Sequence, residues 1–175
     1  MQYNCDYKKR VESFVRERGR IAIVGLGNEY RADDGAGIAL LRLLKYSGVD
    51  RINEVALFEV NRNLLRYVSD IEKFQPSKII LLDAANLGIE AGHIMVLDEK
   101  QIIEKRISTH ENNLDLVMAY FKIVLPEHQI LFVGIQFKSL EMSGELTLTE
   151  EMRKGVEELA RLITDAMLKR QVGPC

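Results

Sequence analysis

Tryptophan is absent from this sequence, cysteine occurs only twice, and no apolar run is long enough to cross a bilayer. A membrane-spanning helix needs roughly 18 consecutive apolar residues, and no stretch approaches that length. The N-terminal stretch 1–14 has no apolar signal core, so we expect neither export by that route nor membrane insertion. Cys5 and Cys175 stand near opposite ends and form neither a disulfide framework nor a metal-ligand spacing. We therefore expect a cytoplasmic protein with two reduced thiols.

A strong excess of charge and the common catalytic motifs are missing as well. The formal net charge is −2, so there is no basic field that would favour nucleic acid or an anionic membrane surface. The sequence contains no P-loop, no G-x-S-x-G elbow and no H-E-x-x-H. Neither cysteine has a catalytic frame, so nucleophilic catalysis by serine or cysteine has no support.

The residues that are present suit one α/β domain. The 175 residues are 47% apolar and 29% charged, which favours a single domain over 1–175 with a sizeable core. Apolar runs alternate with amphipathic stretches, which predicts a twisted, mostly parallel mixed sheet of about five strands with helices on both faces. The predicted strands are 21–24, 52–59, 78–82, 94–97 and 129–136, with a short further strand at 146–148. The predicted helices are 4–18, 34–46, 61–74, 149–169 and a stretch that opens at 108 and closes before Pro126.

Two details of the layout follow from segment length and composition. Residues 1–18 are expected to form a helical appendage to the core, because the stretch is rich in charge and has one apolar side. The segment 84–92 is short for a helical crossover, so mixed strand direction is expected at one edge of the sheet.

The chain is organised around the stretch Ile21–Leu44. A buried strand runs into a glycine-rich turn that carries two adjacent acids, Asp33 and Asp34, and an amphipathic helix follows. We expect Asp33 to cap this helix and Asp34 to face the crevice at the carboxyl ends of the strands. In the structural alternative, both acids only cap the helix and complement its dipole.

Two further acids and one histidine are predicted at the same edge. Glu59 ends the second predicted strand and Asp83 ends the third, and the carboxyl ends of parallel strands share one edge. His110 lies in the first turn of a later helix, where the helix N-terminus favours a neutral imidazole. Asp34, Asp83 and His110 form a plausible ligand set for nickel or zinc, with one position open for water or substrate. In the alternative, Asp83 bonds a neighbouring turn and His110 is structural or exposed.

A nucleotide-binding α/β protein is a second possibility for the same stretch. The dinucleotide fingerprint is G-x-G-x-x-G; Gly25 and Gly27 fit it, but Tyr30 occupies the third glycine position. Glu59 resembles the acid that binds the ribose in such proteins. Against this interpretation, two carboxylates at the helix start would repel a pyrophosphate.

Four stretches are similar, in order, to those of one known family: GLGNEYRADDGAG (25–37), LLDAANLGIEAGHI (81–94), STHENNL (108–114) and FVGIQ (132–136). They resemble the NiFe-hydrogenase maturation endopeptidases, most of all the branch that processes the large subunit of formate-linked, hydrogenase 3 type enzymes. The resemblance implies a single-domain α/β fold with a twisted sheet between helices. The segment 1–18 and the C-terminal tail fall outside it.

By this resemblance, Asp34, Asp83 and His110 are the ligands of the metal site, the same three residues that their predicted positions select. The family usually carries an Asp-Gly-Gly turn after the second strand, associated with substrate choice. Here the stretch is Glu59-Val-Asn, so the acid is kept as glutamate and both glycines are absent. Glu59, Asn28 and Gln136 are further candidates for shaping the cleft and recognising the substrate.

The resemblance also implies an activity. Members of the family are hydrolases that clip a short C-terminal extension from the nickel-loaded precursor of a NiFe-hydrogenase large subunit. The expected enzyme is a metal-dependent, aspartyl-type endopeptidase that acts as a monomer with this precursor as its partner. Nickel is expected to come with the substrate, and zinc or cadmium can substitute at such a site. A non-catalytic chaperone for the same precursor remains an alternative beside nucleotide binding.

Overall fold

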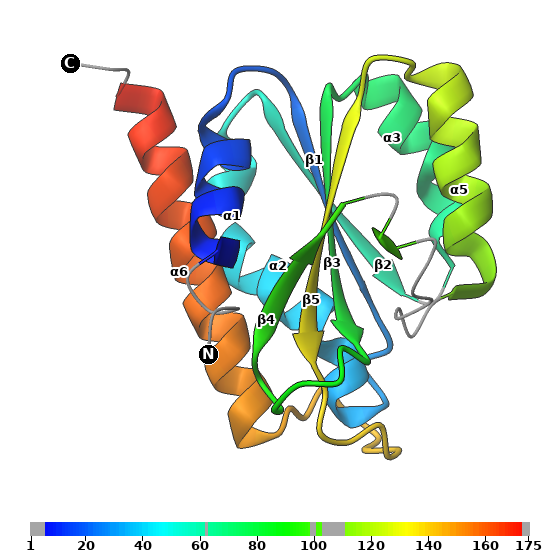
Figure 1. Ribbon diagram of the computed structural model, residues 1–175, viewed down its shortest axis with the longest axis vertical. Helices are drawn as coiled ribbons and strands as arrows, with labels where there is room; N and C mark the ends of the chain where they lie inside the picture. The colour runs from blue at the N-terminus through cyan, green and yellow to red at the C-terminus, as the bar shows by residue number, and fades with distance from the viewer. Residues whose placement is uncertain (1–5, 62, 99–100, 103–110, 173–175) are drawn as a thin grey trace.

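Five strands form one twisted sheet in the computed structural model, which describes residues 6–61, 63–98, 101–102 and 111–172 (Figure 1). The strand order is β2-β1-β3-β5-β4, with β4 antiparallel to β5 and the other neighbouring pairs parallel. The strands are β1 (Ile21–Gly27), β2 (Val55–Asn61), β3 (Lys78–Ala85), β4 (Ile94–Leu97) and β5 (Gln129–Gln136). The predicted fold class is confirmed, and so is the mixed strand direction at one edge.

Helices cover both faces of the sheet (Figure 1). One face carries α1 (Asp6–Arg16), α2 (Ala36–Tyr46) and α6 (Glu150–Val172), and the other carries α3 (Val68–Phe74) and α5 (Glu111–Val124). Short 3-10 turns join them: η1 (Ala32–Gly35), η2 (Val49–Arg51) and η3 (Leu64–Tyr67). Each face of the sheet has its own hydrophobic cluster, because strands such as β1 and β3 are buried along their whole length.

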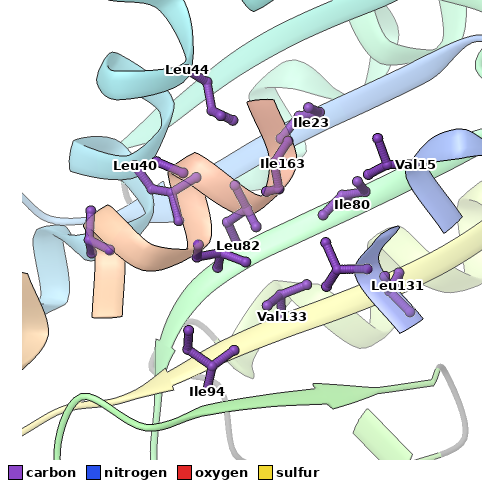
Figure 2. Packing of buried hydrophobic residues seen from close by; sticks show 14 of the residues in the cluster. Val15, Ile23, Leu40, Leu44, Ile80, Leu82, Ile94, Leu131, Val133 and Ile163 are labelled. Carbon is purple, nitrogen blue, oxygen red and sulfur yellow. The ribbon is translucent and has the colours of Figure 1, made fainter. Parts of the chain in front are cut away.

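The N-terminal helix α1 belongs to the larger of these clusters, so the expectation that it is an appendage is wrong. Its Val11 and Val15 are fully buried, and Val15 lies in one cluster with Ile80 and Leu131 (Figure 2). α1 packs against α6 and β4. Burying one valine contributes about 1.5–3 kcal/mol, so α1 contributes to the stability of the whole domain.

Glycines let α2 approach the sheet closely. A Cβ on Gly37 would lie 2.2 Å from the carbonyl oxygen of Leu26 and 2.4 Å from that of Leu82. A Cβ on Gly25 would lie 2.3 Å from the carbonyl oxygen of Gly37. Because a side chain at either position would meet backbone atoms, only glycine permits this contact. The start of α2 is thereby placed over the carboxyl ends of β1 and β3.

The order of the strands reverses at β1. β2 pairs with one side of β1, and the chain then returns to place β3 on the other side. In open α/β sheets, ligands bind beyond the carboxyl ends of the strands at such a reversal. The region between the ends of β1 and β3 is therefore the expected position of a functional site.

Several expected strand bounds differ from the structure: β1 and β3 each run three residues further than expected, to Gly27 and Ala85, and β2 begins at Val55 instead of Ile52. β2 runs past Glu59 to Asn61, because its parallel register with β1 continues as far as Gly27. Residues 146–148 form no strand, because the segment that contains them bonds to the turn after β1 and not to a strand. Within the described ranges, no helix is both long enough and apolar enough to span a membrane.

Candidate active site

The turn after β1 folds back so that η1 lies beside the end of β3. Asn28 donates its backbone N–H to the carbonyl of Asp34 at 3.2 Å, and Asp34 donates its own N–H to the carbonyl of Arg31 at 2.9 Å. The side-chain oxygen of Asn28 accepts the N–H of Tyr30 at 3.1 Å. Ala32 has a φ of 41°, in the left-handed region that L-residues rarely adopt. The turn is therefore a tightly bonded structure with a strained residue directly before the two acids.

Asp33 does not cap the helix that follows it, so this prediction is wrong. Neither η1 nor α2 has a side-chain cap, and the N-cap position of α2 is Gly35. The Asp33 carboxylate is fully buried and accepts four hydrogen bonds from distant residues. Its Oδ2 accepts from the N–H groups of Lys138 and Ser139 at 2.9 and 3.1 Å and from the hydroxyl of Thr149 at 2.9 Å. Its Oδ1 accepts from the N–H of Thr149 at 2.8 Å, so every bond of this carboxylate is structural.

Asp34 is equally buried but differently bonded. Its side chain is 3% exposed, and Nη1 of Arg31 lies 4.0 Å from Oδ2, at the limit of an ion pair. Among the described residues, Oδ1 of Asp34 has no hydrogen-bond partner, although this atom is shielded from solvent. A buried carboxylate oxygen without a partner is costly. It is the arrangement that a cation or a hydrogen-bond donor from a ligand would complete.

Asp83 lies at the same edge of the sheet. It is 1% exposed and sits near the end of β3, in register with Gly134 of β5. β3 continues two residues beyond it, to Ala85. Because β1 and β3 are neighbours and η1 contacts β3, the fold brings Asp34 and Asp83 to the same side of the strand reversal. Both acids are thus buried near one edge of the sheet, and their convergence on a common ion stays a prediction.

His110, the third predicted ligand, falls outside the described residues, as does most of the predicted capping box at Ser108–Glu111. The described part of the chain contains no group of three His, Cys, Asp or Glu side chains that could hold a metal ion. The three-residue ligand set therefore stays a prediction.

Gln136 and Asn28 are buried polar residues with bonds to their own surroundings. Oε1 of Gln136 accepts the N–H of Leu87 at 2.7 Å, and its Nε2 donates to the carbonyl of Phe137 at 3.0 Å. Together with the Asn28–Tyr30 bond, these contacts shape the loops at the carboxyl edge. A role in substrate recognition stays a prediction for both residues.

Glu59, like Asp83, lies two residues before the end of its strand, but unlike the buried acids its carboxylate is exposed. Its register partner is Gly25, and its side chain is 43% exposed. Arg42 on α2 donates to Glu59 at 2.6 Å and to Glu29 at 2.9 Å. The carboxylate of Glu59 is thus paired at the surface, beside the turn and outside the buried pair of acids.

Residues 138–149 were not indicated by the sequence as part of this region. Thr149 directly precedes α6, and its hydroxyl accepts the N–H of Met152 at 3.4 Å, which is a recognisable capping signal. Its bonds to Asp33 join residues 116 positions apart, and no local pattern reveals them.

The fold and the site together define a doubly wound α/β protein with two buried acids, Asp34 and Asp83, near its strand reversal. This chain belongs to the hydrogenase maturation protease family: the HycI family model matches residues 50–166. The expected family is thereby confirmed, and the chain is a peptidase by membership.

Solved and curated relatives agree with this assignment. A solved structure of the [NiFe] hydrogenase maturation protease HycI from Thermococcus kodakarensis KOD1 is 27% identical, with a TM-score of 0.80 over 91% of this chain and 99% of that one. A candidate hydrogenase maturation protease of Methanocaldococcus jannaschii is 27% identical over 151 residues, 83% of this chain and 87% of its own. The hydrogenase 3 maturation protease of Escherichia coli K12 is 28% identical over 112 residues, 63% of this chain and 69% of its own.

Proposed function

We propose that this peptidase removes a C-terminal extension from the nickel-loaded precursor of a NiFe-hydrogenase large subunit. Family membership supplies the class of reaction and the kind of substrate. The observation that carries the metal-recognition part of the proposal is the buried Oδ1 of Asp34, which has no partner among the described residues and lies at the strand reversal.

In this proposal the nickel of the precursor is recognised by Asp34, Asp83 and His110. Two carboxylates and one imidazole suit a divalent ion of borderline softness, so zinc or cadmium can replace nickel in experiments. The two acids are buried in advance at one edge of the sheet, so recognition needs little reorganisation of these side chains. A precursor without nickel lacks this anchoring contact, which explains how an unfinished substrate is rejected.

The chemical step is hydrolysis of one peptide bond. A divalent ion next to the scissile bond polarises its carbonyl and makes a nearby water more acidic. One of the two buried carboxylates accepts the proton of the attacking water and passes it to the leaving amine, as a general base and then a general acid. Burial of both acids keeps bulk water from competing for these hydrogen bonds.

The nucleotide-binding alternative is disfavoured by the glycines that suggested it. Gly25 and Gly27 face the protein itself: a Cβ on Gly25 would lie 2.3 Å from the carbonyl oxygen of Gly37, and one on Gly27 would lie 2.6 Å from that of Asp34. Glu59, the candidate ribose ligand, is paired with Arg42. The glycine pattern is therefore explained by the close packing of α2 on β1.

The test is to incubate the purified chain with nickel-loaded and nickel-free precursor and to measure the mass of the large subunit. Shortening of the loaded form alone is expected. Asp34→Asn, Asp83→Asn and His110→Ala should each lower the rate at least about 1,000-fold, because each removes a metal contact. His93→Ala is the matched control, since His93 is exposed. Binding of the precursor without shortening would support the chaperone alternative, and full activity of His110→Ala would overturn the proposed ligand set.

A further inference from the structure

The loop of residues 137–149, which contains neither helix nor strand, runs beside the turn that carries Asp34. Three backbone groups of the turn bond to it: the N–H of Ala32 to Oγ of Ser143 at 3.2 Å, the N–H of Asp33 to the carbonyl of Ser139 at 3.1 Å, and the carbonyl of Tyr30 to the N–H of Ser143 at 2.9 Å. Hydrogen bonds therefore join the turn and the 137–149 loop at several positions, although the two segments lie more than 100 residues apart in sequence.

The carboxylate of Asp33 is the centre of this contact. All four of its hydrogen bonds come from the 137–149 loop, three of them from backbone N–H groups, and the side chain is fully shielded from water. Bonds from N–H groups to an ionised acceptor are among the stronger hydrogen bonds in proteins. If the carboxylate were removed, the three N–H groups would lose their partner inside the protein.

The strained residue Ala32 lies between these bonds. Its φ of 41° is disfavoured for any residue with a Cβ, and such a conformation persists only where the surroundings determine it. Here the N–H groups of Ala32 and of the following Asp33 are both bonded to the 137–149 loop. The direction of the chain as it enters Asp34 is therefore determined by contacts with that loop.

We infer that Asp33 is a positioning residue, which fastens the 137–149 loop to the turn and thereby holds the backbone at Asp34 in its place beside β3. Without the Asp33 carboxylate, Ala32 relaxes toward an ordinary conformation and the Asp34 backbone moves with it. The structural part of this inference stands on these contacts alone. Its catalytic consequence rests on the proposed function.

The structural part is tested by amide hydrogen exchange, read by NMR, in Asp33→Ala and the isosteric Asp33→Asn. The N–H of Asp34 bonds to the carbonyl of Arg31 and does not touch the Asp33 side chain. Its exchange should nevertheless accelerate at least about tenfold in Asp33→Ala, together with the amides of the 137–149 loop, and less in Asp33→Asn. The control is Ile163→Ala, a fully buried α6 residue that destabilises the fold away from the turn. If loop amides open while the Asp34 amide keeps wild-type protection, Asp33 does not position Asp34.

The catalytic part is tested with saturating nickel-loaded precursor. Asp33→Ala should lower kcat about 100-fold with a smaller change in KM, while Ile163→Ala keeps the wild-type kcat at a temperature where both are folded. A folded Asp33→Ala that cuts at the wild-type rate refutes the inference. If the wild type does not shorten the precursor, the proposed function fails, and the exchange measurement alone decides on positioning. If Asp33→Ala does not fold, Asp33→Asn carries both comparisons.

Discussion

The ammonium of Lys78, at the start of β3, is buried and makes the stability of this protein depend on pH. Lys78 is 2% exposed, and its Nζ donates to the backbone carbonyls of Phe14, at 2.8 Å, and of Glu17. The pKa of Lys78 is lowered from 10.5 to about 8, mainly by burial and also by the nearby Arg170, while Glu17 and Glu54 partly oppose the change. Keeping this ammonium charged in the folded protein therefore lowers the free energy of unfolding.

The sign of the effect follows from the direction of the shift. Since the folded protein releases this proton more readily than the unfolded chain, the unfolded chain binds more protons between about pH 8 and the unfolded pKa of 10.5. The free energy of unfolding therefore rises with pH across this window, and the cost is present in full below it. Between about pH 8 and about pH 9.5, Lys78 alone should add about 1.5 kcal/mol.

The assay is urea unfolding of the wild type and of Lys78→Met at several pH values in this range. Methionine keeps most of the side-chain volume and cannot titrate, so the difference between the two proteins should shift by about 1.5 kcal/mol in favour of the wild type as the pH rises. Lys73→Met, which removes an exposed ammonium, controls for net charge. A difference that stays constant within about 0.3 kcal/mol would show that Lys78 carries no such cost.

Two further predictions concern the turn and the helix that follows it. Gly37→Ala should lower the free energy of unfolding by about 2 kcal/mol or more, because the new Cβ meets the carbonyl oxygens of Leu26 and Leu82 and α2 must move away; a wild-type urea midpoint would contradict this packing. Asp34→Asn should raise the free energy of unfolding by about 1 kcal/mol while activity is lost, because it removes a buried charge whose Oδ1 has no partner among the described residues. A clear loss of stability in Asp34→Asn would instead indicate a stabilising contact.

The arrangement of the sheet could be predicted because each central strand is buried on both faces. β1 and β3 are buried at every position, so they are continuous apolar runs that stand out from the amphipathic helices between them. β4 and β5 were predicted with the bounds that the structure shows. The position of α1 was harder to predict: its apolar side indicates that one face is buried, but not that α6 and β4 cover it.

The site was predictable where a residue's place depends on its own strand. Asp34 follows β1 and Asp83 lies near the end of β3, so parallel pairing alone brings them to one edge. The same argument places Glu59 near the end of β2, but it does not show that this carboxylate is exposed and pairs with Arg42. Nothing in the local sequence around Glu59 indicates that pairing, which depends on how α2 packs against the sheet.

The sequence pattern around Asp33 and Asp34 correctly indicates two buried acids in a turn, but it assigns Asp33 the wrong role, that of a helix cap. Successive side chains of a 3-10 turn project in directions about 120° apart, so Asp33 and Asp34 face different surroundings. The carboxylate of Asp33 receives four hydrogen bonds, three of them from backbone N–H groups. The fold is therefore able to supply hydrogen-bond donors to both oxygens of a buried carboxylate. Asp34, one residue later and equally shielded, keeps an oxygen without a partner among the described residues. Since the incomplete bonding costs stability, it supports a role in which Asp34 completes its contacts with a group that another molecule brings.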